Sequence, residues 1–180
     1  MALTSTIFRA ELSISDIDRN YYETHALTLA RHPSETDERM MVRLLVFALH
    51  ADAQLAFAGD ISNNDEPALW RKDLTGEVAD WIEVGQPDAK VVRKAAGRSH
   101  RVLIYAYGRS AVTWWTKQGA DFTRFDNLSV YRISDATCRD LAALAVRNMT
   151  LQCLIQDGAV TLSNAGNSVE VEIEMLKAAG

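Results

Sequence analysis

The chain has 180 residues, of which 48% are hydrophobic, and this length and composition suffice for one sizeable core. Its formal net charge of −5 argues against a protein that coats nucleic acid non-specifically, because that mode of binding needs many cationic contacts with phosphates. The first residues lack a basic stretch before an apolar core, and the longest apolar runs are shorter than a membrane span. We therefore expect a single cytoplasmic domain over residues 1–180.

The N-terminal part predicts a β-hairpin followed by a helix. Two β-rich runs, 4–15 and 21–30, are joined by a segment whose Asp and Asn residues favour a turn. Ser34 then precedes several acidic residues, a pattern typical of a helix N-cap, and the spacing of apolar residues continues this helix to about residue 52. Beyond it we expect only a short strand, at 55–58.

The most informative segment lies in the middle of the chain. Residues 81–84 form a short β-rich run that Gly85 ends, and Pro87 suits the first position of a helix. Gly97 is placed to end that helix, and residues 101–107 are nearly all apolar, as in a strand buried on both faces. The segment therefore predicts a β-α-β unit with parallel strands.

This unit brings an acidic residue and basic residues together. Glu83 lies near the carboxyl end of its strand, where open α/β sheets bind ligands. Lys90 and Lys94 share one helix face, and their side chains lean toward the helix N-terminus. Residues 85–101 hold five basic residues and one acidic residue, a net charge of +4. This pattern predicts a metal and phosphate site, and the alternative is that both lysines are solvated charges on a surface helix.

The C-terminal half predicts further helices and strands. A helix is expected over 109–118, ended by Gly119, followed by a strand over 128–133. Ser134 and Asp135 are expected to begin another helix that continues to about residue 148.

The end of the chain predicts antiparallel strands. The runs 150–156 and 159–163 flank Asp157-Gly158, a strong two-residue hairpin signal. Alternating apolar and acidic residues over 169–175 predict one more strand. The whole pattern indicates a mixed α/β (α+β) fold in which helices flank a central mixed β-sheet, with an N-terminal hairpin and C-terminal antiparallel strands.

Several kinds of site are disfavoured. Cys138 and Cys153 have no spacing typical of zinc or redox sites, so we expect buried, reduced thiols. The four histidines are scattered without a metal-binding spacing, and no nucleotide-binding or serine-hydrolase motif is present. Trp114 and Trp115 could stack unpaired bases, or could instead serve the core and an interface.

Four segments, 29–36, 81–88, 93–95 and 149–158, together resemble the bacterial YaeQ family over essentially the whole chain. This resemblance implies a fold related to the PD-(D/E)XK nuclease superfamily, with a restriction-endonuclease-like core in which acidic residues surround magnesium. It does not imply a known reaction.

In the nuclease pattern, an Asp and an (Asp/Glu)-x-Lys tripeptide hold Mg²⁺ against the scissile phosphate. The resemblance assigns the second acid to Glu83, but Gly85 stands where the pattern has Lys. Some superfamily members take that Lys from the following helix, so Lys94 is the first candidate here and Lys90 the second. For the first acid, Asp73 is the leading candidate as a metal ligand with Glu83.

Asp80 and Asp65 remain alternatives for the first acid, and Glu35 could add a helix-borne carboxylate. The leading hypothesis is a Mg²⁺-dependent nuclease-like phosphodiesterase that acts on nucleic acid. The alternative is a non-catalytic module that binds protein or nucleic acid on a degenerate nuclease scaffold, because function depends on sites rather than folds.

Overall fold

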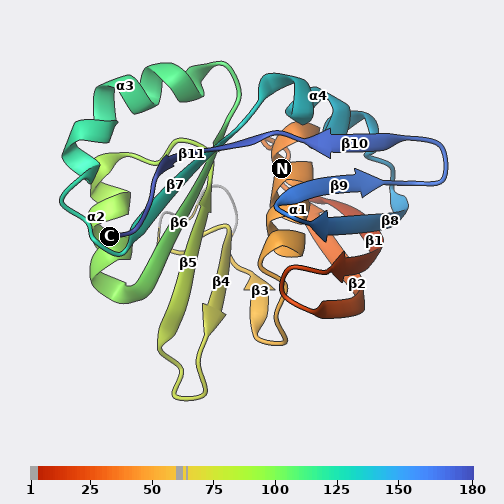
Figure 1. The fold of residues 1–180 in the computed structure, drawn as a ribbon, viewed down its shortest axis with the longest axis horizontal. Helices are drawn as coiled ribbons and strands as arrows, with labels where there is room; N and C mark the ends of the chain where they lie inside the picture. The colour runs from red at the N-terminus through yellow and green to blue at the C-terminus, as the bar shows by residue number, and fades with distance from the viewer. Residues whose placement is uncertain (1–3, 60–62, 64) are drawn as a thin grey trace. The chain divides into compact units, whose positions relative to one another are not determined.

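A computed structural model describes residues 4–59, 63 and 65–180 of the chain (Figure 1). By its contacts the chain divides into two compact units, which we call unit 1 and unit 2. Unit 1 comprises Met1–Ala48 and Ala136–Glu172, and unit 2 comprises Leu49–Asp135 and Ile173–Gly180. The expectation of a single domain over residues 1–180 stays a prediction.

Unit 1 contains a five-stranded sheet with the order β10-β9-β8-β1-β2. Its strands are β1 (Thr6–Asp16), β2 (Tyr21–Arg31), β8 (Asn148–Gln156), β9 (Ala159–Ser163) and β10 (Ser168–Val171). β1 pairs antiparallel with β2, which confirms the N-terminal hairpin, and it pairs parallel with β8 from the other end of the chain. Its core-facing residues alternate with exposed ones, as the period of a half-buried strand requires.

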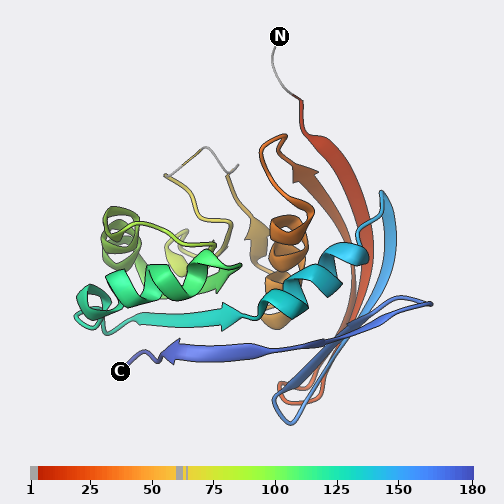
Figure 2. The same cartoon turned by 90° about the horizontal axis from the view of Figure 1, so that it is seen from above.

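Hydrogen bonds join the β8–β9 hairpin turn of this sheet to the β1–β2 hairpin turn. Asp157 and Gly158 both have positive φ, 52° and 77°, as a type I′ turn requires, so the predicted β8–β9 hairpin is confirmed. The backbone N–H groups of these two residues donate to the Asp18 carboxylate at 2.7 and 2.9 Å. Figure 2 shows this turn beside the β1–β2 turn that carries Asp18.

The helices of unit 1 are shorter than predicted. Helix α1 (Asp37–Leu49) has Thr36 as its N-cap, because the Thr36 hydroxyl accepts from the Arg39 N–H at 3.1 Å. The prediction of Ser34 was wrong, since its hydroxyl lies 2.6 Å from His32 Nδ1 instead. Helix α4 (Asp135–Ala143) ends five residues before position 148, where β8 begins.

Unit 2 contains a six-stranded mixed sheet with the order β11-β7-β6-β5-β4-β3. Its strands are β3 (Leu55–Phe57), β4 (Leu69–Lys72), β5 (Val78–Val84), β6 (Ser99–Tyr107), β7 (Leu128–Ile133) and β11 (Ile173–Lys177). β5, β6 and β7 are mutually parallel, whereas the other pairs are antiparallel. The mixed α/β class and the central β-α-β unit are therefore confirmed.

Helices α2 (Ala89–Arg98) and α3 (Ser110–Phe122) cover one face of this sheet. The cluster that joins them to the sheet consists of Trp81, Val102, Ile104, Leu128 and Val130 from the strands, Val92 and Ala95 from α2, and Phe122 from α3. Because paired residues of neighbouring strands point to the same face, the register places Glu83 on this face too, opposite Ile104. We call it the helical face of unit 2.

Three predicted helix boundaries in unit 2 were wrong. Asp88 caps α2 by accepting from the Val91 N–H at 2.9 Å, so Pro87 precedes the helix rather than beginning it. Gly97 lies inside the last turn of α2 and Gly119 lies inside α3. At Gly119 an added Cβ would meet the Trp115 ring at 2.9 Å, so glycine serves close packing there and does not end the helix.

The predicted strand over 169–175 is two strands in two different sheets. β10 pairs with β9 in unit 1, and β11 pairs with β7 in unit 2. The break falls at Glu172, whose N–H donates to the Thr137 hydroxyl at 3.0 Å. Within the described part of the chain, no helix has the length and apolarity that a membrane span requires.

Candidate functional site

Glu83 lies near the carboxyl end of β5 and is partly buried. The Trp81 indole N–H donates to Glu83 Oε1 at 2.7 Å, which fixes the carboxylate on the helical face. Trp81 itself is 2% exposed and packs edge-on against Trp70 of β4. The carboxylate is therefore held by a rigid, buried neighbour two residues away on the same strand.

Lys94 reaches from α2 to Asp65, a residue in the segment before β4. Its ammonium donates to Asp65 Oδ1, and α2, which carries Lys94, covers the face of the sheet that bears Glu83. The hydrogen bond and charge of Lys94 lower the pKa of Asp65, with smaller contributions from Arg98 and Lys90. Both predicted lysines thus act on Asp65, one of the two alternatives for the first acid.

Asp73 lies in the turn between β4 and β5, at the other end of β5 from Glu83. Its neighbour Lys72 pairs with Val78, five residues before Glu83, which corresponds to roughly 17 Å of strand. One Mg²⁺ ion holds its ligands at about 2.1 Å, so these two carboxylates do not share an ion in this structure. The structure does not bring the predicted metal pair together.

Asp80 faces away from Glu83, because three residues along a strand lead to the opposite face. Its two carboxylate oxygens accept from Arg71 Nε and Arg101 Nε, both at 2.8 Å. Burial would raise the pKa of Asp80, but the hydrogen bonds and charges of Arg101 and Arg71 outweigh burial and lower the pKa. Asp80 is thus part of an ion-pair cluster and not of the Glu83 face.

Glu35 belongs to unit 1 and is 6% exposed. Arg43 donates to it through Nε at 2.7 Å and through Nη2 at 2.9 Å, and Arg39 Nη1 donates at 2.8 Å. Two guanidinium groups therefore hold the carboxylate against the start of α1. This arrangement accounts for Glu35 as a structural residue.

Gly85 explains why the nuclease tripeptide lacks its lysine. Its φ is 118°, a backbone conformation that residues with side chains rarely adopt. Its N–H continues the sheet by donating to the Tyr105 carbonyl at 2.9 Å. A lysine at this position would strain the chain, so any cation that assists Glu83 must come from another element.

Trp114 and Trp115 are partly buried and pack against the core of the helical face. The Trp114 indole N–H donates to the Pro87 carbonyl at 2.9 Å, and both rings lie against Phe122. These contacts favour the structural alternative over the stacking of unpaired bases.

An open hollow of about 620 Å³ lies on the helical face, beside Asp65, Trp81 and the end of α2. It is lined by Asp65, Trp70, Gly76, Glu77, Val78, Trp81, Gly97, Arg98, Ser99 and His100. The hollow combines two indole rings with acidic and basic side chains, so it offers room for a polar molecule next to the Lys94–Asp65 pair.

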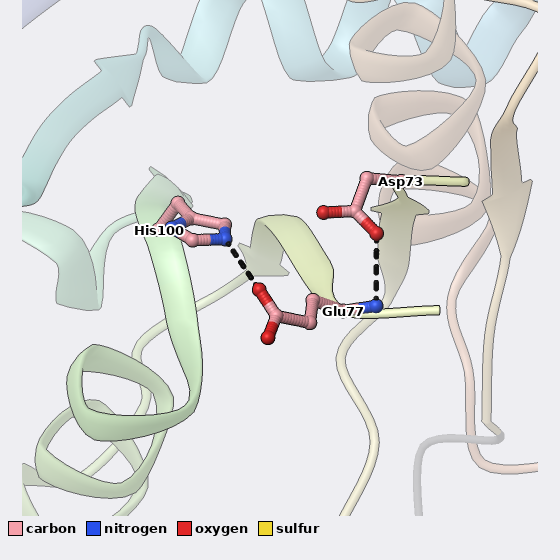
Figure 3. A group of neighbouring side chains, drawn as sticks. All are labelled: Asp73, Glu77 and His100. Carbon is pink, nitrogen blue, oxygen red and sulfur yellow. Dashed lines mark hydrogen bonds and ion pairs between the residues drawn. The ribbon is translucent and has the colours of Figure 1, made fainter. Parts of the chain in front are cut away.

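A cluster of three potential metal ligands borders the hollow (Figure 3). Asp73, Glu77 and His100 each offer one ligand atom, and these atoms all lie within 4.8 Å of one another. Sequence analysis gave Asp73 a metal role but missed its neighbours, because His100 belongs to a different strand and shows no metal-binding spacing.

Comparisons with known proteins agree over almost the full chain. The family model for the YaeQ protein matches residues 1–173. The chain belongs to the YaeQ family. Among its members, proteins described as "Uncharacterized protein YaeQ" from Salmonella typhi and Escherichia coli K12 are 45% and 42% identical over 175 residues, which is 96% of each chain.

Two crystal structures of YaeQ proteins share the fold. The one from Xanthomonas axonopodis pv. citri is 48% identical, with a TM-score of 0.93 over 97% of this chain and 99% of that one. The one from Pseudomonas syringae is 38% identical, with a TM-score of 0.92 over 97% of each chain. The predicted resemblance to the YaeQ family is therefore confirmed.

Proposed function

We propose that the chain is a metal-dependent phosphodiesterase that acts on nucleic acid through Glu83, Asp65 and Lys94. The observation that carries this proposal is the ion pair between Lys94 and Asp65 on the helical face that also bears Glu83. An acid, a second acid and a lysine from α2 are the three groups that a nuclease of the PD-(D/E)XK type needs, with the lysine moved from position 85.

The residue types on this face are those that Mg²⁺ uses, whereas Asp73 lies at the other end of β5 from Glu83. Mg²⁺ uses one or two carboxylates and completes its shell with water and substrate phosphate oxygens. Glu83 and Asp65 supply two carboxylates, and the lowered pKa of Asp65 keeps that group ionised. When bound, the ion would polarise the phosphate and lower the pKa of a coordinated water.

The remaining residues of the face have clear roles in this proposal. Trp81 orients Glu83 through its indole N–H, so the carboxylate is preorganised before substrate arrives. Lys90, Lys94 and Arg98 lie along α2 and provide positive charge for phosphates. Lys94 is the group that faces the developing charge, and a phosphate would compete with Asp65 for its ammonium.

The connectivity of unit 2 supports a relation to the PD-(D/E)XK superfamily. An antiparallel series β3-β4-β5 leads through α2 into β6, which lies parallel to β5. In the nuclease pattern the two acids lie on neighbouring strands. Glu83 lies on β5, and Asp65 lies in the segment that leads into the neighbouring strand β4.

The test measures cleavage of single-stranded, duplex and structured oligonucleotides with Mg²⁺ or Mn²⁺. We expect Glu83→Gln, Asp65→Asn and Lys94→Ala each to lower the rate by at least ~100-fold, because each removes a group that acts on the transition state. Lys117→Ala serves as the charge-matched control, since Lys117 is exposed on α3. Cleavage that survives Glu83→Gln at the wild-type rate would refute the proposal.

A second candidate function is non-catalytic binding of nucleic acid or a protein partner on the same scaffold. One observation favours it. The ammonium of Lys94 already donates to Asp65, and Gly85 stands where the nuclease tripeptide has its lysine. This function predicts that wild-type protein binds oligonucleotides without cleaving them at any Mg²⁺ concentration. Lys94→Ala and Arg98→Ala would then weaken binding and its salt dependence, whereas Glu83→Gln would not.

A further inference from the structure

We propose that Asp73, Glu77 and His100 form a binding site for a divalent transition metal such as Zn²⁺, at the opposite end of β5 from Glu83. The site unites the β4–β5 turn, which carries the two carboxylates, with the start of β6, which carries the imidazole. This inference is independent of the proposed phosphodiesterase activity.

The geometry is close to that of a metal site without an ion. The three ligand atoms lie within 4.8 Å of one another, and His100 Nε2 lies 3.2 Å from Glu77 Oε2. Ligand atoms bound to Zn²⁺ at about 2.0–2.2 Å in a tetrahedron lie about 3.4 Å apart. Glu77 and His100 have 69% and 65% exposed side chains, so they can close by the remaining ångström or so through rotation of exposed bonds.

Asp73 is the fixed member of the site. Its Oδ1 accepts from the Thr75 N–H, the Thr75 hydroxyl and the Glu77 N–H, at 2.9, 2.6 and 3.0 Å. Figure 3 shows its other oxygen pointing toward the side of Glu77 and His100. These three hydrogen bonds hold the Asp73 carboxylate in place.

The donor set selects the kind of metal. One imidazole nitrogen with two carboxylate oxygens suits Zn²⁺, Co²⁺ or Ni²⁺, whereas Mg²⁺ and Ca²⁺ prefer oxygen ligands alone. Two carboxylates close to each other also repel, and a divalent ion between them removes that repulsion. The site therefore differs in metal preference from the Mg²⁺ site proposed at Glu83.

The site is also open on one side. Glu77 and His100 line the hollow of about 620 Å³ on the helical face. Three protein ligands leave a coordination position for water or a further ligand, as in zinc sites that keep one open position. A polar molecule in the hollow could therefore reach a metal bound here.

The test titrates tag-free, chelator-treated full-length protein with Zn²⁺ by calorimetry and with Co²⁺ by visible absorption. We expect one equivalent of each metal to bind. We expect Glu77→Gln and His100→Ala each to weaken binding by at least ~10-fold, since even the loss of an outer-shell partner of a metal ligand has effects of that size. Both residues are exposed, and circular dichroism would verify that both variants fold.

Two controls make the outcome decisive. His32→Ala removes a histidine of unit 1 and should leave the titration unchanged. Glu83→Gln should also leave it unchanged, and a loss of Zn²⁺ binding in that variant would assign the metal to Glu83 and overturn this assignment. Absence of binding at millimolar Zn²⁺, or equal binding by wild type and His100→Ala, would also overturn it.

Discussion

Asp80 shows how a buried carboxylate is retained in the sheet of unit 2. It is 4% exposed and accepts from two arginines on neighbouring strands. Because its pKa is lowered in the folded protein, its contribution to stability is present above the unfolded pKa of about 3.9 and is lost as the pH falls through the folded pKa. This sign leads to a pH-dependent prediction.

We expect Asp80→Asn to lower the free energy of unfolding by about 1–3 kcal/mol at pH 7, because two guanidinium groups lose their anion. The difference from wild type should shrink below about pH 4, where the wild-type carboxyl also takes up a proton. Urea unfolding over a pH series checks this, with the exposed Asp121→Asn as control. A difference that stays constant down to low pH would contradict the assignment.

The sequence alone could not identify the first acid, for a physical reason. Glu83 was correctly placed near the carboxyl end of a strand, because the periods of neighbouring elements are visible in the sequence. Which acid lies near Glu83 depends on the strand register and on the face of the sheet to which each side chain points. A shift of one residue exchanges the faces, so Asp65, Asp73 and Asp80 could not be ranked without pairings.

Gly85 likewise needed a backbone angle to be understood. In the sequence it reads as a missing lysine, whereas its φ of 118° shows a position that suits glycine. The apparent defect in the motif is therefore a requirement of the chain between β5 and α2.

At the scale of elements, two glycines inside helices give opposite predictions. At Gly119 an added Cβ would lie 2.9 Å from the Trp115 ring, whereas at Gly97 nothing lies within 4 Å. Alanine is favoured over glycine in a helix by about 1 kcal/mol. At Gly119, crowding against Trp115 therefore decides whether alanine raises or lowers the free energy of unfolding.

We expect Gly97→Ala to raise the free energy of unfolding by about 0.5–1 kcal/mol. Gly119→Ala should lower it by about 1–3 kcal/mol, because the ring of Trp115 cannot move without disturbing Phe122. Thermal and urea unfolding of the two variants checks both signs, and each serves as the control for the other. Stabilisation by Gly119→Ala would contradict the prediction, because it would show that the Trp115 ring can move aside at little cost.

The strands and hairpins were predicted better than the helix ends. Alternating apolar residues and the Asp157-Gly158 turn are local signals, and both hairpins formed as expected. Helix ends depend on competition between neighbouring polar groups, as between Ser34 and Thr36. The split of the last strand was also hidden, because β10 and β11 share one alternating pattern and differ only in their partners.

At the scale of the whole molecule, each unit is built from two separate segments of the chain. The last eight residues, Ile173–Gly180, return to unit 2 and add the edge strand β11. Lys177 Nζ donates to the carbonyls of Phe125 and Leu128, both at 2.9 Å, and Glu174 pairs with Arg132. The C-terminus therefore completes a sheet built from the middle of the chain.

We expect removal of residues 173–180 to expose β7 as a new sheet edge. Hydrogen exchange in 128–133 should rise by at least ~10-fold, and the protein should self-associate more readily, because an unpaired edge strand offers free backbone groups. Exchange measured by mass spectrometry and light scattering check this. Removal of 178–180 alone spares β11 and is the control, and unchanged exchange in β7 would contradict the prediction.

The parallel pairing of β1 with β8 has a consequence for synthesis of the protein. Arg9 pairs with Asn148, so one neighbour of the first strand emerges from the ribosome only after unit 2 has largely been made. The nascent chain must hold a hairpin whose free edge awaits its partner, and such edges invite pairing with other chains. Slow or interrupted translation after residue 135 should therefore favour aggregation of the nascent chain more than interruption near its end.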